Sequence, residues 1–172
     1  MRLAMILASI LLLVVPVVGI ACGSGDDANT EGSGNDNLVE GLVSPTWIDA
    51  QVEGDTVSIA TSELTSGKQL HFKISTDEGD RTYMAYQLGG ETHVRANVCP
   101  PCKSIRFSRE GDELICDNCS TVFNALTGDG ISGACRNFPK ARVNTETNGD
   151  STTMSLSDLS HAYDDTQKAG WP

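Results

Sequence analysis

The chain has 172 residues, with 12 basic and 23 acidic side chains and a formal net charge of −11. Such an acidic surface repels phosphates, so the composition argues against a nucleic-acid partner. The 17 glycines, together with many threonines and serines, disfavour long helices.

The N-terminus has the pattern of a targeting segment. Arg2 is followed by an apolar run from Leu3 to Val18, and a small residue, Ala21, directly precedes Cys22. We therefore predict a lipoprotein signal peptide over residues 1–21, forming a signal helix, with Cys22 lipidated as the first residue of the mature chain. An uncleaved membrane anchor and an ordinary secretory signal are the alternatives. The run is shorter than the roughly 20 apolar residues that span a bilayer comfortably.

Each of these interpretations places the remaining chain outside the cytoplasm, and lipidation would anchor it to the bacterial cell membrane. Residues 22–37 are almost entirely Gly, Ser, Asp, Asn, Glu and Thr, which predicts a flexible tether. Residues 38–159 have the length of one ordinary domain. Residues 160–172 are predicted to be a C-terminal tail.

The domain shows the alternation of β-strands. Apolar and polar residues alternate over 56–61, 70–74, 84–88 and 154–156, and glycine-containing turn signals separate these runs. The turn signals include Glu53-Gly54-Asp55, Gly89-Gly90 and Glu110-Gly111-Asp112. The pattern predicts an all-β fold, an antiparallel sandwich or barrel, with two cysteine-bearing hairpin loops.

Four cysteines form two identical CxxC pairs, Cys99/Cys102 and Cys116/Cys119, with thirteen residues between them. A CxxC pair places two sulfurs on one metal, and two pairs supply the four soft ligands that Zn²⁺ or iron–sulfur centres prefer. Because both pairs lie at the tips of hairpin-like connections, we predict that they converge on a common centre.

The number of cysteines leaves alternatives open. If Cys22 is lipidated, five thiols remain, which fits four metal ligands and one extra thiol, or two disulfides and one free thiol. The extra thiol, Cys135, could be a fifth ligand, a resolving thiol for redox exchange or a small buried residue. A thioredoxin-like CxxC would require a following helix, whereas residues 103–115 have the pattern of a strand, a turn and a strand.

The charge near the cysteines differs from that of the whole chain. Between Arg95 and Arg142 there are seven basic and five acidic residues. Nearby cations would stabilise metal thiolates, although ordinary surface solvation explains the same pattern. His71 and His93 lie in alternating strands, where we expect them to face solvent or an interface and not a metal.

The cysteine region also resembles a known family. Residues 94–143 share with the FtrD-like iron–sulfur-type proteins an ANxC entry, a CxxC, a Gly-Asp turn, a Leu-Ile-Cys-x-x-Cys, a Phe and a late Gly-x-Cys before an Asn and a Pro. The segment is more distantly similar to the cluster-binding loops of Rieske domains. The histidine of each Rieske loop is replaced here by Cys102 or Cys119, so the resemblance implies an all-thiolate site.

The resemblance implies a Rieske-like fold and an iron–sulfur cluster or iron, with Zn as the alternative. We therefore expect a lipid-anchored extracytoplasmic protein for electron transfer or for metal handling linked to iron uptake, with a membrane redox or iron-transport partner. A structural zinc module and a thiol–disulfide exchange protein are the alternatives. No catalytic triad, phosphate loop or paired catalytic carboxylate stands out, which favours a carrier or binding protein over an enzyme.

Overall fold

The computed structural model describes residues 41–65 and 67–171. These belong to one compact unit, Gly34–Pro172. The predicted signal peptide, Cys22 and the tether lie outside the described residues. Within the described part, no helix has the length and apolar character needed to span a membrane.

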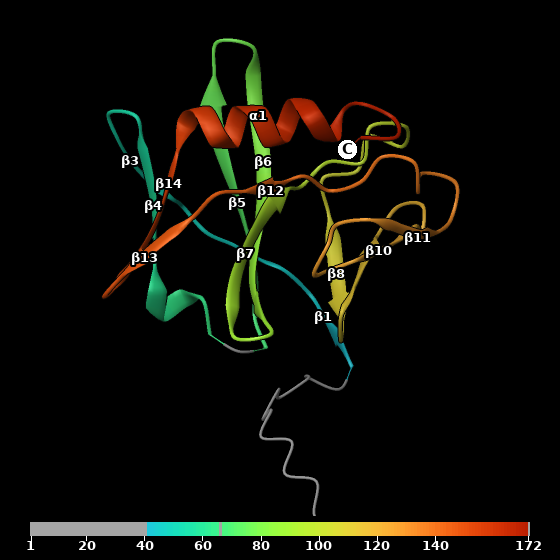
Figure 1. Cartoon of the computed structure of the whole chain (residues 1–172), viewed down its shortest axis with the longest axis horizontal. Coiled ribbons are helices and arrows are strands. Elements are labelled where there is room, and N and C mark those ends of the chain that lie inside the picture. Colours follow the sequence, from blue (N-terminus) through green and yellow to red (C-terminus); the bar gives the residue numbers. More distant parts are fainter. Residues whose placement is uncertain (1–40, 66, 172) are drawn as a thin grey trace, which may run out of the picture. The chain divides into compact units, whose positions relative to one another are not determined.

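Strands arranged in three sheets dominate the described part of the chain (Figure 1). The cysteine sheet has the order β1 (Leu42–Val43), β8 (Phe107–Glu110), β9 (Glu113–Cys116), β10 (Val122–Asn124) and β11 (Gly130–Ser132). The central sheet has the order β12 (Arg142–Val143), β7 (Glu91–Ala96), β6 (Gly79–Leu88), β5 (Gln69–Thr76) and β2 (Thr46–Trp47). The third sheet has the order β13 (Glu146–Asn148), β14 (Ser151–Ser155), β4 (Thr56–Ala60) and β3 (Gln51–Glu53).

The pairing is antiparallel throughout these sheets except between β2 and β5, which run parallel. The predicted antiparallel all-β fold is therefore confirmed. A short 3-10 helix, η1 (Thr61–Glu63), follows β4, and one α-helix, α1 (Leu156–Thr166), follows β14.

Strand β6 contributes to two separate apolar cores because its side chains alternate between the faces of the sheet. Tyr83 and Ala85 pack into the core formed with the third sheet and α1. Met84 and Tyr86 face the other way, into a core that also contains Cys99 and other cysteines. The central sheet is therefore buried on both faces, and one face forms the floor beneath the cysteine sheet.

Polar side chains join the central sheet to the cysteine sheet. Gln69 donates to the carbonyl of Phe107 (2.7 Å), and Tyr86 donates to the carbonyl of Ala125 (2.7 Å). Arg95 is 1 % exposed and donates to the carbonyls of Lys140 (2.6 Å) and Leu126. Buried polar groups stabilise a fold only when they are hydrogen-bonded, so these contacts fix the position of the cysteine loops above the floor.

The two strand histidines lie in this interface, which is one of the two environments expected for them, and not at the solvent-exposed surface. His71 is fully buried, lies 3.2 Å from the Gln69 amide nitrogen and makes an edge contact with Trp47. His93 is also buried and stacks on Tyr86. Burial lowers the pKa of His71 to about 4 and also lowers the pKa of His93.

The C-terminal segment is the second correction, because residues 160–166 are helical and not part of a tail. Ser155 caps α1 by accepting a hydrogen bond from the N–H of Asp158 (3.0 Å), and Leu159 and Ala162 are buried in the core. The short motif Ser155-x-x-Asp158 signals such a helix start, but strand alternation running into Leu156 obscured it.

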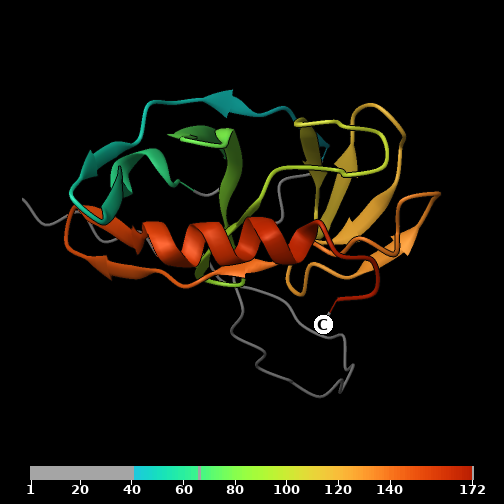
Figure 2. The same cartoon turned by 90° about the horizontal axis from the view of Figure 1, so that it is seen from above.

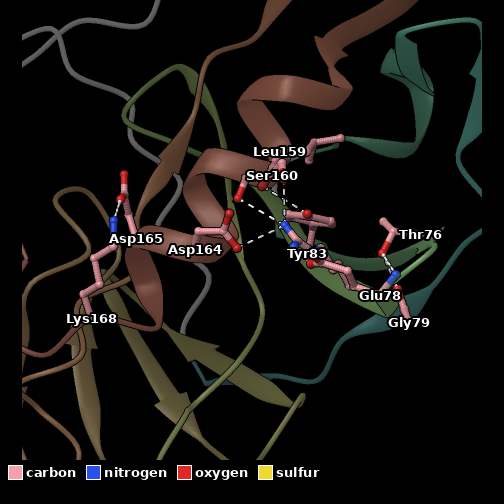
Figure 3. Close-up of polar contacts among 10 residues, drawn as sticks. Thr76, Glu78, Gly79, Tyr83, Leu159, Ser160, Asp164, Asp165 and Lys168 are labelled. Atoms are coloured by element: carbon pink, nitrogen blue, oxygen red, sulfur yellow. Dashed lines mark hydrogen bonds and ion pairs between the residues drawn. The ribbon is translucent and has the colours of Figure 1, made fainter.

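Helix α1 lies across the central strands, as two views at right angles show (Figure 1, Figure 2). Tyr83 of β6 donates to the carbonyl of Leu159 (3.0 Å). Arg81, also on β6, donates to Ser160 Oγ (2.7 Å) and pairs with Asp164 (3.2 Å), in the network of Figure 3. These contacts complete the core on the side of the central sheet that faces away from the cysteines.

Stability should depend on pH through His71. Its folded pKa of about 4 is below the ordinary 6.5, so between these values the folded state binds fewer protons than the unfolded state. The stability gained from neutral His71 is complete above pH 6.5 and is lost as the pH falls toward 4, by up to about 3 kcal/mol.

We expect His71→Phe to flatten this dependence. The measurement is the free energy of unfolding in denaturant at several pH values from 7 to 4 for both proteins. Because both proteins contain the same cysteines, the effect of acid on the thiols is common to them and cancels in the comparison. Equal slopes in the two proteins would contradict the assignment.

Candidate metal centre

The structure brings the four CxxC sulfurs together. The Sγ atoms of Cys99, Cys102, Cys116 and Cys119 all lie within 4.8 Å of one another. Cys99 is 4.0 Å from Cys119 and Cys102 is 3.7 Å from Cys116, so each close contact joins one pair to the other. The two predicted hairpin tips therefore converge. The five described cysteines are free, so the predicted alternative of paired disulfides is not present in the structure.

The two CxxC loops have the same backbone hydrogen bonds. The N–H of Cys99 donates to the carbonyl of Ser104 (2.8 Å), and the N–H of Lys103 donates back to the carbonyl of Cys99 (2.7 Å). Seventeen residues later the same two bonds recur, from Cys116 to Thr121 (2.9 Å) and from Ser120 to Cys116 (2.9 Å). We call residues 99–104 and 116–121 the first and second knuckles, because each is a closed turn that presents two sulfurs.

Backbone conformation supports this equivalence. Lys103 and Ser120, each directly after the second cysteine of its knuckle, are the non-glycine residues with positive φ in the described chain, at 59° and 54°. This left-handed conformation costs roughly 1 kcal/mol for a residue with a Cβ atom. Both knuckles have a residue in this unfavourable conformation at the same position, which indicates that the same turn geometry occurs twice in the chain.

The knuckles differ in the hydrogen bonds that their sulfurs receive. In the second knuckle, the hydrogen bond with Cys99 lowers the pKa of the Cys116 thiol to about 4, and the N–H groups of Cys119 and Asn118 add to the effect. The residue in the first knuckle that corresponds to Asn118 is Pro101, which has no N–H to donate. The pKa of Cys99 is raised by its hydrogen bond with Cys116 and by burial.

Cys135 lies beside the four sulfurs but outside their mutual group. Its Sγ is 3.7 Å from that of Cys119, and its N–H donates to the hydroxyl of Thr121 (3.2 Å). Gly133 allows this approach, since a Cβ there would meet the Thr121 side chain at 2.6 Å and the φ of +100° disfavours other residues. The structure thus confirms that Cys135 is near the site and leaves it as a fifth thiol next to a set of four.

A buried cation packs against aromatic rings of the core that contains the cysteines. Lys140 is 1 % exposed, donates to the carbonyl of Val98 (2.7 Å) and lies over the rings of Phe107 (5.2 Å) and Phe123 (4.4 Å). No carboxylate pairs with it in the described residues. Burial lowers its pKa to about 8, while the charges of the cysteine thiolates act in the opposite direction.

An unpaired buried ammonium is costly, because removal from water penalises its charge. The groups that can compensate Lys140 are the thiolates, and four thiolates around a divalent or trivalent metal carry net negative charge. Lys140 therefore fits an anionic metal centre and not a group of four neutral thiols. The excess of basic residues between Arg95 and Arg142 had pointed to this region, but the sequence did not single out Lys140.

The set of mutually close ligand atoms in the described residues contains cysteine sulfur alone. Neither His71 nor His93 contributes an atom to this set. Cys99 and Cys116 are buried, whereas Cys102 and Cys119 are partly exposed, so the centre is shallow.

A protein-family model matches the part of the chain that contains these cysteines. The model for "Membrane iron-sulfur containing protein FtrD-like" matches residues 64–164, more than half of the chain. The chain belongs to the FtrD-like family. The match includes both knuckles and Cys135, and it confirms the resemblance seen in the cysteine segment.

Comparisons with individual proteins are more distant. None of the curated proteins matches the chain significantly. A chain from the complex of reduced oxygenase and oxidized ferredoxin in carbazole 1,9a-dioxygenase superimposes with a TM-score of 0.49 and 16% identity, covering 60% of this chain and 94% of its own. The Sphingomonas yanoikuyae B1 ferredoxin gives a TM-score of 0.40 and 16% identity, covering 49% of this chain and 84% of its own.

Family membership and the four-cysteine group together support an iron–sulfur cluster or iron as the cofactor of this FtrD-like protein. The donor set fits, because thiolate is the ligand of iron in such centres. The buried Lys140 fits as well, because it supplies positive charge beside an anionic group.

Restoring the missing N–H in the first knuckle should strengthen metal binding. The backbone of Asn118 lowers the pKa of Cys116. In Pro101→Ala, we expect the new N–H to donate to Cys99 and to stabilise its thiolate in the same way, and one such bond corresponds to about threefold to tenfold in affinity. The measurement is competition with a chelator for Co²⁺ or Zn²⁺.

Pro100→Ala is the matched control. Its counterpart in the second knuckle, Asp117, donates its N–H to the carbonyl of Arg106 and not to sulfur. Both variants loosen the unfolded chain to a similar extent. Equal metal affinities of Pro101→Ala and Pro100→Ala would show that the missing N–H of Pro101 does not limit metal binding.

Removal of the buried charge should weaken the loaded state. Lys140→Met keeps the length and apolar stem of the side chain but leaves the thiolate centre uncompensated, so we expect metal affinity to fall about tenfold, or about 1.4 kcal/mol. The metal-free protein should be as stable as the parent or more stable, because the cost of burying the ammonium disappears. Equal destabilisation of both forms, seen by denaturant unfolding with and without metal, would indicate a packing role alone.

Proposed function

We propose that this FtrD-like protein is a lipid-anchored extracytoplasmic electron carrier whose centre is held by Cys99, Cys102, Cys116 and Cys119, and that it serves electron transfer or metal handling linked to iron uptake. The observation that carries the proposal is the group of four mutually close thiols near the buried Lys140, which pairs with no carboxylate in the part of the chain that the structure describes. Membership in a membrane iron–sulfur family and the lipoprotein pattern around Cys22 support it.

The geometry suits an electron carrier. The two buried sulfurs, Cys99 and Cys116, are enclosed by the apolar core that contains Phe107 and Phe123, which excludes water from that side. The two partly exposed sulfurs, Cys102 and Cys119, lie on the side from which an electron can enter or leave. When bound, iron supplies the one-electron redox step, and the chain fixes its ligands so that little rearrangement accompanies the change of charge.

The buried charge would tune such a centre. Reduction adds negative charge to the thiolate group, and the ammonium of Lys140 favours that state. The predicted tether, if anchored at Cys22, would let the domain reach a redox or iron-transport partner in the membrane.

A structural zinc site is the second candidate. Four sulfurs at these separations suit Zn²⁺, which prefers a closed tetrahedral set of thiolates and has no redox chemistry. Thiol–disulfide exchange has less support, because each CxxC is enclosed in a knuckle with no helix after it.

The redox proposal is tested on the full chain, purified anaerobically from membranes in detergent. We expect iron and a visible spectrum that bleaches reversibly on reduction, with a potential that falls in Lys140→Met. A colourless protein that contains zinc and shows no redox transition would overturn the electron-transfer proposal in favour of the structural site.

The anchoring proposal has a separate test. Cys22→Ser should leave the spectrum unchanged but abolish incorporation of labelled fatty acid and release the protein from washed membranes. Cys135→Ser is the control, since that thiol lies in the folded domain. Membrane retention and normal labelling of Cys22→Ser would contradict a lipid anchor at this residue.

A further inference from the structure

The spacing of the four sulfurs distinguishes between kinds of metal centre. A single ion with four thiolates at about 2.3 Å places every pair of sulfurs about 3.8 Å apart, because the ligands form a regular tetrahedron. A two-iron cluster puts two thiolates on each iron, with sulfides between the irons, so sulfurs on different irons are roughly 5.5 Å apart or more. A four-iron cluster separates all four thiolates by still larger distances.

The observed separations match the first arrangement. The close contacts, 3.7 Å between Cys102 and Cys116 and 4.0 Å between Cys99 and Cys119, are near the tetrahedral edge. All other separations within the group are at most 4.8 Å. No division of the four into two pairs leaves the pairs far enough apart for a sulfide-bridged cluster.

The backbone supplies an independent argument. Both knuckles have the same pair of hydrogen bonds and the same left-handed residue after the second cysteine, Lys103 or Ser120. Two equivalent turns, each offering two sulfurs, enclose one ion between them as two halves of a tetrahedron. An inserted cluster would require the knuckles to move apart, against the contacts that hold them.

Those contacts are hydrogen bonds of ordinary length at the exposed side of the knuckles. Asn118 of the second knuckle donates to the carbonyl of Cys102 in the first (3.2 Å). The N–H of Asp117 donates to the carbonyl of Arg106 (3.1 Å), and Ser108 donates to the Asp117 carboxylate (2.8 Å). The second knuckle is thus hydrogen-bonded to the first knuckle and to the segment after the first knuckle, which leads into β8.

We infer that the centre is a single metal ion on four thiolates, and not a sulfide-bridged cluster, with Cys135 as an adjacent thiol outside the ligand set. The inference rests on the proposed metal-binding function and specifies its cofactor: an iron or zinc ion without inorganic sulfide. It also bears on assembly, because a bare ion can be acquired after export, whereas a cluster must be built from iron and sulfide.

The test measures composition on the full chain purified anaerobically from membranes. Metal by mass spectrometry and acid-labile sulfide are determined per chain. We expect one iron or zinc ion and no sulfide. Two irons with two sulfides per chain would overturn the inference and leave the electron-transfer proposal intact. One zinc would uphold the inference and overturn that proposal, and metal-free protein would overturn both.

Titration with Co²⁺ after metal removal gives a second measurement that does not depend on activity. We expect saturation at one equivalent, with the visible bands of a tetrahedral thiolate complex. Cys135→Ser should titrate like the parent, whereas Cys102→Ser, at a partly exposed position, should bind more weakly and with altered bands. Saturation at two equivalents, or loss of the bands in Cys135→Ser, would contradict the assignment.

Discussion

The mutual approach of two knuckles is the constraint on which the cysteine half of the molecule depends. Four thiols within 4.8 Å of one another cannot all ionise in an apolar core unless a cation holds them together, because thiolates repel at this distance. The structure supplies part of that compensation through Lys140 and through N–H groups aimed at Cys116. A metal ion supplies the remainder, so binding and local folding are expected to be coupled.

The central sheet makes this arrangement possible because each of its faces packs into a separate apolar core. One face of β6 packs under α1 and the third sheet, which gives the domain an ordinary apolar core. The other face carries Met84 and Tyr86 toward the cysteines, and Arg95 ties that face to the loops through backbone carbonyls. The metal centre therefore packs on a sheet whose other face has an apolar core of its own.

The two knuckles share one turn geometry but differ in how well they stabilise negative charge on their sulfurs. Pro101 has no N–H to offer Cys99, whereas the backbone of the corresponding Asn118 lowers the pKa of Cys116. Charge is therefore stabilised better on the second knuckle, which also touches Cys135 through Cys119.

The sequence by itself determined the ligand types, their pairing as CxxC, the antiparallel strands and the family, because these depend on local spacing and alternation. It misjudged Leu156–Thr166, where strand-like alternation and a capping motif overlap within a few residues, and it left open whether His71 and His93 face solvent or an interface. Only the tertiary structure decided that the four sulfurs lie within 4.8 Å of one another, and that the buried Lys140 near them has no carboxylate partner among the described residues. Such facts depend on contacts between residues far apart in the chain, and the burial that makes them energetically important exists only after the sheets have packed.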